Sequence, residues 1–268
     1  MRFLGLQMED RIPDAKTIWL FREHLKEQNL MEVLFKQFHA QLAQRGYIVR
    51  SGQMIDATFV EVPKQRNTRE ENALLKENAV PIEWGRDENK PMLAQKDTEA
   101  RWTKRNDEKH YGYKNHINAD QTHKLIQTYT VTDAAVHDSQ AIDDLLDTQT
   151  DTNGAKRPVY ADSAYRSKER ETHLAQQNIP SQICEKGSRG HPLTEAQKVA
   201  NHEKSKVRSR VEHVFGAQVQ MGGHWVRTIG LLRAKVKIGM MNLVYNMMRL
   251  VQLIKRDRIG ASAIWKTA

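Results

Sequence analysis

The sequence predicts an α/β fold in which helices flank a mixed five-stranded sheet, preceded by a partial helical domain. Short apolar runs bounded by Gly, Pro, Asn or Asp alternate with segments whose apolar residues recur every three or four positions, as in strands among helices. A chain of 268 residues, 39% of them hydrophobic, can bury a core. No apolar run reaches the roughly 18 residues of a membrane span, and the amino terminus has no apolar signal core. With a single cysteine, Cys184, these features predict a cytoplasmic protein without a membrane partner.

The elements can be placed in order along the chain. Asp14 is positioned to cap a first helix, and a second apolar set at helical spacing follows Asn29 and stops at Gly46. Beyond them, the patterns predict strands at about 53–62, 110–120, 124–134, 157–165 and 178–184, and helices at about 138–146, 168–177, 196–217 and 235–254. The second and third strands are expected to form an antiparallel hairpin that turns at 121–123. This order of elements is that of the ribonuclease H-like fold.

The same patterns divide the chain into regions. Residues 1–48 form the helical amino-terminal region, 49–256 the ribonuclease H-like domain, and 257–268 a carboxyl-terminal tail. The polar stretch 64–109 has both charge signs, two prolines and little periodicity, so we expect a surface insertion with little regular structure. The last predicted helix carries an apolar stripe that we expect in the core or at a subunit interface, namely Met240, Leu243, Val244, Met247 and Val251.

The net charge of +9 is concentrated in one part of the chain. Between Lys186 and Lys237, eleven Lys and Arg residues stand against three acids, so this stretch carries most of the excess. A concentrated basic surface favours a polyanionic partner, most often nucleic acid. A solvated face that keeps the protein soluble explains the charge equally well, and composition does not choose between the two.

Three carboxylates stand where a sheet and a packed helix could bring them together. Asp56 interrupts the apolar run MIDATFV, Asp162 ends the run PVYAD before a turn, and Glu212 borders an apolar helical stripe. A buried carboxylate needs a partner, a metal ion or a proton. Each acid also has an ordinary interpretation: a neighbouring amide for Asp56, a turn cap for Asp162, and for Glu212 a helical pair with Arg208.

Such a set of acids is suited to metal chemistry. Three carboxylates can hold two divalent cations about 3.5–4 Å apart. Two Mg²⁺ ions, or Mn²⁺ in their place, accept carboxylates together with water and phosphate oxygens. One ion would activate water or a 3′-hydroxyl, and the other would stabilise the leaving oxygen during in-line displacement at phosphorus.

Five phrases in order along nearly the whole chain carry a family likeness. They are MIDATFVEVPKQRNTREEN, DTEARWTKRNDEKHYGYKNHINAD, YTVTDAAVHDSQA, VYADSAYRS and RSRVEHVFG. Together they resemble the DDE transposases of bacterial insertion sequences, specifically the IS-five group. The resemblance implies that Asp56, Asp162 and Glu212 are the catalytic acids and the metal ligands. It also implies an enzyme that cleaves transposon ends and transfers strands, with double-stranded DNA as partner and a homodimer or larger assembly on that DNA.

The resemblance further implies DNA contacts near the acids. Lys114 and His116 share one strand face, and Arg208 and Arg210 precede Glu212, so all four could reach backbone phosphate. Ordinary polar positions on a strand and on a solvated helix explain them about as well.

The chain departs from the family pattern in two places. The related IS-four grouping has a signature with a Tyr and a Lys around the Arg and Glu, and here Ser205 and Val219 stand at those positions. The amino terminus resembles the middle of the helical DNA-binding domain that precedes the core, so Trp19, Phe21 and Leu25 are expected to lack part of their cover. A shortened copy could be inactive, and the alternative function is then a DNA-binding or dimerising regulator of a full-length transposase. A metal-dependent nuclease without strand transfer is a third interpretation.

Overall fold

The computed structural model describes residues 5, 7, 9–49, 51–150 and 154–264, with side chains as far as residue 257. The helices are α1 (Ala15–Glu27), α2 (Leu30–Gln44), α3 (Arg69–Lys76), α4 (Lys90–Leu93), α5 (Ile142–Leu145), α6 (Lys168–Gln176), α7 (Glu195–Arg208), α8 (Glu212–Gln220) and α9 (Leu231–Ile264). The strands are β1 (Gln53–Glu61), β2 (Arg101–Arg105), β3 (Glu108–Asp120), β4 (Ile126–Asp133) and β5 (Val159–Tyr160). Of the predicted tail, 257–264 continue α9, and 265–268 lie outside the described residues, as do 1–4, 6 and 8 of the amino-terminal region.

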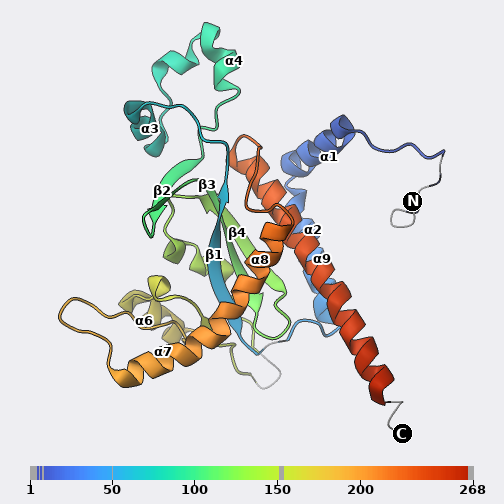
Figure 1. Cartoon of the computed structure of the whole chain (residues 1–268), viewed down its shortest axis with the longest axis vertical. Helices are drawn as coiled ribbons and strands as arrows, with labels where there is room; N and C mark the ends of the chain where they lie inside the picture. The colour runs from blue at the N-terminus through green and yellow to red at the C-terminus, as the bar shows by residue number, and fades with distance from the viewer. Residues whose placement is uncertain (1–4, 6, 8, 50, 151–153, 265–268) are drawn as a thin grey trace.

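A mixed, curled sheet lies at the centre of the molecule (Figure 1). β3 pairs antiparallel with β1, with β4 and, at its start, with β2, whereas β1 pairs parallel with β5. The predicted β3–β4 hairpin with its turn at 121–123 is confirmed. With its flanking helices, this α/β arrangement is consistent with the predicted ribonuclease H-like fold.

Two strand predictions were wrong in extent. Residues 178–184 do not form a regular strand; in them only Ser181 makes an isolated parallel bridge, to Val159 of β5. Pro180 has no amide hydrogen, which limits the ladder that this segment can form. The strand predicted at 157–165 is reduced to the two residues of β5.

The insertion at 64–109 is more regular than its composition predicts, because it contains α3, α4 and β2. Asn106 and Asp107 close the β2–β3 hairpin with φ of 48° and 67°. Two successive positive φ values give the primed turn that matches strand twist. The hairpin therefore extends the sheet, and α3 and α4 project beyond it (Figure 1).

The helix predicted at 196–217 is broken into α7 and α8. A 3₁₀ turn, η5 (Ser209–Val211), separates the two, and the Ser209 hydroxyl donates to the Lys206 carbonyl at 3.3 Å. Such local bonds compete with regular helix geometry. The last helix, predicted at 235–254, is longer on both sides, since α9 spans Leu231–Ile264.

The two faces of the sheet bury different residues of β1. Met54 packs with Val211, Val214 and Phe215 on the α8 side. Ile55 packs with residues of α5, α6 and β5 on the opposite side. Because successive strand residues alternate between faces, the sequence of β1 fixes which helices each side chain meets.

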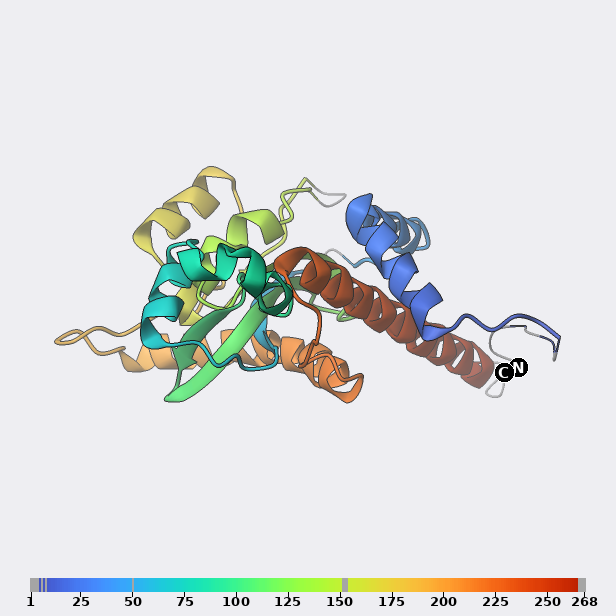
Figure 2. The same ribbon diagram turned by 90° about the horizontal axis from the view of Figure 1, so that it is seen from above.

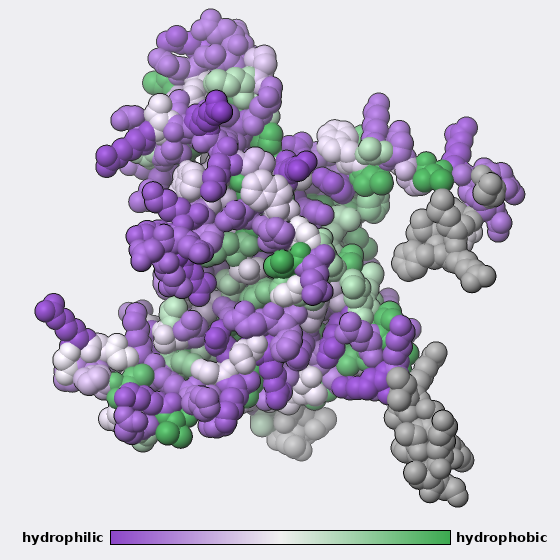
Figure 3. Space-filling model, viewed as in Figure 1, coloured by the Kyte–Doolittle hydropathy of each residue, from purple (hydrophilic) through white to green (hydrophobic). Residues whose placement is uncertain are grey.

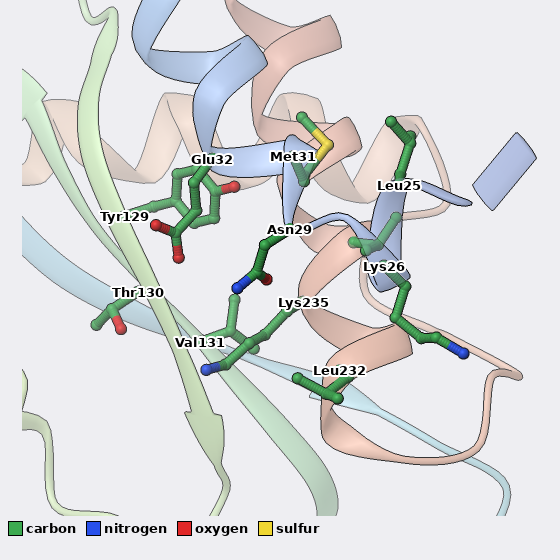
Figure 4. Close-up of a pocket in the computed structure, with 11 residues that line it drawn as sticks. Leu25, Lys26, Asn29, Met31, Glu32, Tyr129, Thr130, Val131, Leu232 and Lys235 are labelled. Atoms are coloured by element: carbon green, nitrogen blue, oxygen red, sulfur yellow. The ribbon is translucent and has the colours of Figure 1, made fainter. Parts of the chain in front are cut away.

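The amino-terminal helices pack along α9 (Figures 1 and 2). As predicted, Asp14 caps α1, accepting from the Thr17 amide at 2.7 Å. Leu25 is 4% exposed, whereas Trp19 and Phe21 of the same helix are 48% and 56% exposed. Where the α1–α2 connection meets β4 and α9 there is a small cavity of about 50 Å³, drawn in Figure 4.

A group of buried amides joins β3, α8 and α9. Asn115 and Asn242 exchange hydrogen bonds of 2.9 and 3.1 Å, and the Gln218 amide donates to the Asn242 side-chain oxygen at 2.7 Å. All three side chains are at most 2% exposed.

Among the described residues, no helix has both the length and the apolar composition that crossing a bilayer requires.

Candidate active site

Asp56 lies in the middle of β1 and is 6% exposed. It follows Met54 by two residues, so its side chain points to the α8 side of the sheet. One carboxylate oxygen accepts the amide of the next residue, Ala57, at 2.8 Å, and the other accepts from Arg208 Nη1 at 2.9 Å. A carboxylate in an apolar strand thus has partners but little water.

Burial raises the pKa of Asp56 from 3.8 to about 6. The Ala57 amide and the Arg208 guanidinium oppose this rise because both favour the ionised form, whereas the Glu212 carboxylate adds to it. A second acid near a buried acid, with cations alongside, is typical of sites that bind cations or move protons.

Arg208 and Glu212 stand on either side of the helix break at η5. Val211 and Val214 are buried against the sheet and fix the start of α8, where Glu212 lies. Arg208 Nη1 is 3.6 Å from Glu212 Oε1, so the predicted helical pair is present. The same guanidinium nitrogen also binds Asp56, and Arg208 therefore connects two of the three predicted acids.

Asp162 follows β5 and precedes a short 3₁₀ turn, η4 (Ser163–Tyr165). Its side chain makes no capping bond to that turn and instead accepts from the Ser163 hydroxyl at 3.0 Å. The interpretation of this half-buried acid as a side-chain cap of the turn is therefore wrong.

The three acids line one cavity of about 330 Å³. One wall is β1 from Asp56 onward, another is the tip of the β2–β3 hairpin with Arg105, and Arg208 and Glu212 close the α8 side. The three predicted acids, far apart in the sequence, are thus brought to a single cavity that also contains two arginines.

The donor set of this cavity fits a divalent cation, since three carboxylates offer the hard oxygen ligands that Mg²⁺ and Mn²⁺ accept. Within the described residues, however, no three His, Cys, Asp or Glu side chains are arranged so that they could hold one ion. Arg208 Nη1 instead contacts one oxygen of Asp56 and one oxygen of Glu212.

Two of the predicted DNA contacts, Lys114 and His116, are buried in the structure. Lys114 is 7% exposed and donates to the Val136 carbonyl at 2.7 Å and to Asp138 at 2.8 Å. His116 is fully buried beside Thr132 at 2.9 Å, and burial lowers its pKa to about 4. Neither side chain presents a surface to phosphate in this structure.

Arg210 is exposed but lies outside the cavity. Its guanidinium donates to the Gln121 carbonyl at 3.4 Å, in the β3–β4 turn. Of the four predicted DNA contacts, only Arg208 is among the residues that line the cavity with the acids.

Arg105 is a cavity residue that the site prediction missed. Its side chain is 44% exposed and its nearest acid, Asp138, is 4.0 Å away and already bound by Lys114. The sequence does not single it out, because Lys104 and Arg105 are adjacent cations on the same strand and both side chains are exposed.

Comparison with known proteins identifies one family over most of the chain. Residues 48–247 match the family model described as "Transposase DDE domain". No solved structure matches the chain at a significant level.

Proposed function

Because the chain belongs to the transposase DDE domain family, we propose that it cleaves DNA at transposon ends and joins the freed strand to target DNA. We further propose that it is of the IS-five group and that Asp56, Asp162 and Glu212 are its catalytic acids. The observation that carries the proposal is that these three acids line one cavity together with two arginines.

Each side chain has a distinct task in this proposal. Asp56 is held rigidly by β1 and by the Ala57 amide, and Asp162 and Glu212 approach from the end of β5 and the start of α8. Two Mg²⁺ or Mn²⁺ ions, when bound, would activate water or a 3′-hydroxyl and stabilise the leaving oxygen. Arg105 and Arg208 would contact the phosphate that enters the cavity, since arginine binds phosphate oxygens in fixed geometry.

The proposed partner is double-stranded DNA, with a second copy of the chain assembled on it. The basic stretch between Lys186 and Lys237 supports binding to DNA. Exposed apolar side chains on α1 and α9 support contact with a second copy of the chain, and apolar surface gathers on that side of the molecule in Figure 3. Mass measurement by light scattering, with and without DNA, tests the assembly, and Met247→Glu is expected to weaken it.

A strand-cleavage and strand-transfer assay tests the proposed activity. The substrate is a labelled duplex that carries the ends of the element encoding this chain, with Mg²⁺ or Mn²⁺. Asp56→Asn and Glu212→Gln are expected to abolish cleavage and transfer. Glu203→Gln is the matched control, because it removes an acid that lies on α7 outside the cavity.

The outcomes separate the interpretations. Metal-dependent cleavage and joining, lost in both variants, support the transposase. Cleavage without joining indicates a nuclease. Salt-sensitive DNA binding that is unchanged in Asp56→Asn, with no cleavage by the wild type, indicates a silent regulator and overturns the proposed activity.

A further inference from the structure

Arg208 makes contacts that a metal ion would also make. Its Nη1 atom is 2.9 Å from Asp56 Oδ2 and 3.6 Å from Glu212 Oε1. A single positively charged group thus lies against one oxygen of each of two acids that face the cavity.

The bond to Asp56 is the stronger of the two contacts. The Asp56 side chain is 8% exposed, so its hydrogen bond to a guanidinium has little competition from water. Glu212 is 59% exposed, and at 3.6 Å its pairing with Arg208 is loose. A cation that coordinates Asp56 through this oxygen must first displace Arg208.

The Arg208 side chain is placed so that it could leave Asp56 and bind a DNA phosphate. Its side chain is 22% exposed, and it stands at the end of α7 beside the 3₁₀ turn, at the edge of the cavity. A guanidinium that leaves a carboxylate is well matched by a phosphate, to which it can donate two parallel hydrogen bonds. DNA entering the cavity supplies such groups.

We propose that Arg208 is a positioning residue that couples DNA binding to metal binding: it pairs with Asp56 and, more loosely, with Glu212 while the cavity is empty, and DNA phosphate draws it away so that the acids can bind metal. This inference rests on the proposed function, because it takes Asp56 and Glu212 as metal ligands. Coupling is reciprocal, so the metal ion also raises the affinity for DNA.

Mn²⁺ binding to the purified protein tests this directly, since the electron paramagnetic resonance signal of free Mn²⁺ reports binding without catalysis. Mn²⁺ binding is measured with and without a short duplex DNA, at low temperature so that the protein does not cleave the duplex. Without DNA, Arg208→Gln is expected to bind Mn²⁺ about 10-fold more tightly than the wild type, or more, since it removes a charge-assisted bond to the ligand. Arg208→Lys, which keeps the cation, is expected to stay near the wild type. DNA is expected to tighten Mn²⁺ binding by a larger factor in the wild type than in Arg208→Gln.

Two control variants distinguish a specific contact from general charge. Arg105→Gln removes a cation from the same cavity that does not bond to Asp56, and Arg210→Gln removes one outside it. If either tightens Mn²⁺ binding as much as Arg208→Gln, or if Arg208→Gln leaves it unchanged or weaker, the inference is overturned. Asp56→Asn must weaken Mn²⁺ binding; if it does not, the proposed metal site itself fails. Thermal unfolding of every variant confirms that the fold is kept.

Discussion

Replacing Asp56 by Asn is expected to make the metal-free protein more stable at pH 8. The rise in pKa from 3.8 to about 6, caused first by burial, corresponds to about 3 kcal/mol against the ionised carboxylate in the folded state. Asn has no charge but keeps an oxygen for the Ala57 amide. The free energy of unfolding should therefore increase by up to about 3 kcal/mol.

The sign of this effect gives it a characteristic pH dependence. Protonated Asp56 favours the folded state, so its contribution is complete below about pH 3.8 and is lost as the pH rises through about 6. The difference between Asp56→Asn and the wild type should then be near zero at pH 4 and reach its full size by about pH 7.

Urea titrations from pH 4 to pH 8 with a chelator measure this difference. Glu195→Gln, at an acid whose side chain is 86% exposed, is the control and should leave the curve close to that of the wild type. A wild type that is more stable than Asp56→Asn at pH 8, or a difference that does not change with pH, would refute the reasoning. Adding Mn²⁺ should stabilise the wild type more than the variant, because a ligand stabilises the state that binds it.

Three further predictions concern the frame that holds the site. Gly112 has a φ of 147°, and a Cβ there would lie 2.4 Å from a backbone oxygen of β1, so Gly112→Ala should lower the free energy of unfolding by about 2 kcal/mol or more; an unchanged urea midpoint would contradict this. Tyr113→Phe removes a hydroxyl within 2.8 and 2.7 Å of the two oxygens of buried Asp97, and calorimetry should show a loss of about 1–3 kcal/mol. Glu23 is bound by Arg233 at 2.6 and 2.8 Å, and hydrogen bonding by that arginine lowers its pKa to about 2. Its contribution is present above about pH 4.5 and is lost as the pH falls through about 2, so Glu23→Gln should lower the urea midpoint at pH 7 but not at pH 2.

Asp56 was predictable because its signal is local. A charged residue inside an apolar, strand-like run needs a partner, and alternation along β1 then places it on the α8 side. The pairing of Arg208 with Glu212 was also local, at helical spacing. That Arg208 binds Asp56 as well was not predictable, since the two residues are 152 positions apart and only the tertiary fold brings them together.

Lys114 and His116 show where alternation fails. Polar residues two apart on a strand normally indicate a solvated face, but β3 is a central strand, paired on both edges and covered by packed elements. The polar side chains of this strand find partners inside, as Lys114 does in Asp138. Their burial depends on which strand is central in the sheet. The order of strands cannot be predicted from the local sequence of one strand.

The stripe on α9 shows a similar limit. Met247 and Val251 are 43% and 51% exposed, whereas Ile238 and Tyr245 are buried. The helix carries apolar residues on more than one face, and helical periodicity does not say which of them meets the sheet. An interface role for the exposed residues stays a prediction.

The buried amides of Asn115, Gln218 and Asn242 have a consequence for the accuracy of the site. An apolar seam would tolerate a helix that slides or rotates slightly, because dispersion forces have little direction. Buried amide groups must hydrogen-bond to one another, and they can do so in only one placement of the two helices against the strand. A single buried polar residue fixes the register of a coiled coil in the same way. Gln218 lies on the same helix as Glu212, so the hydrogen bonds among these amides fix the position and rotation of α8 against the sheet. The position of Glu212 relative to Asp56 thus depends on buried amides that lie further along α8.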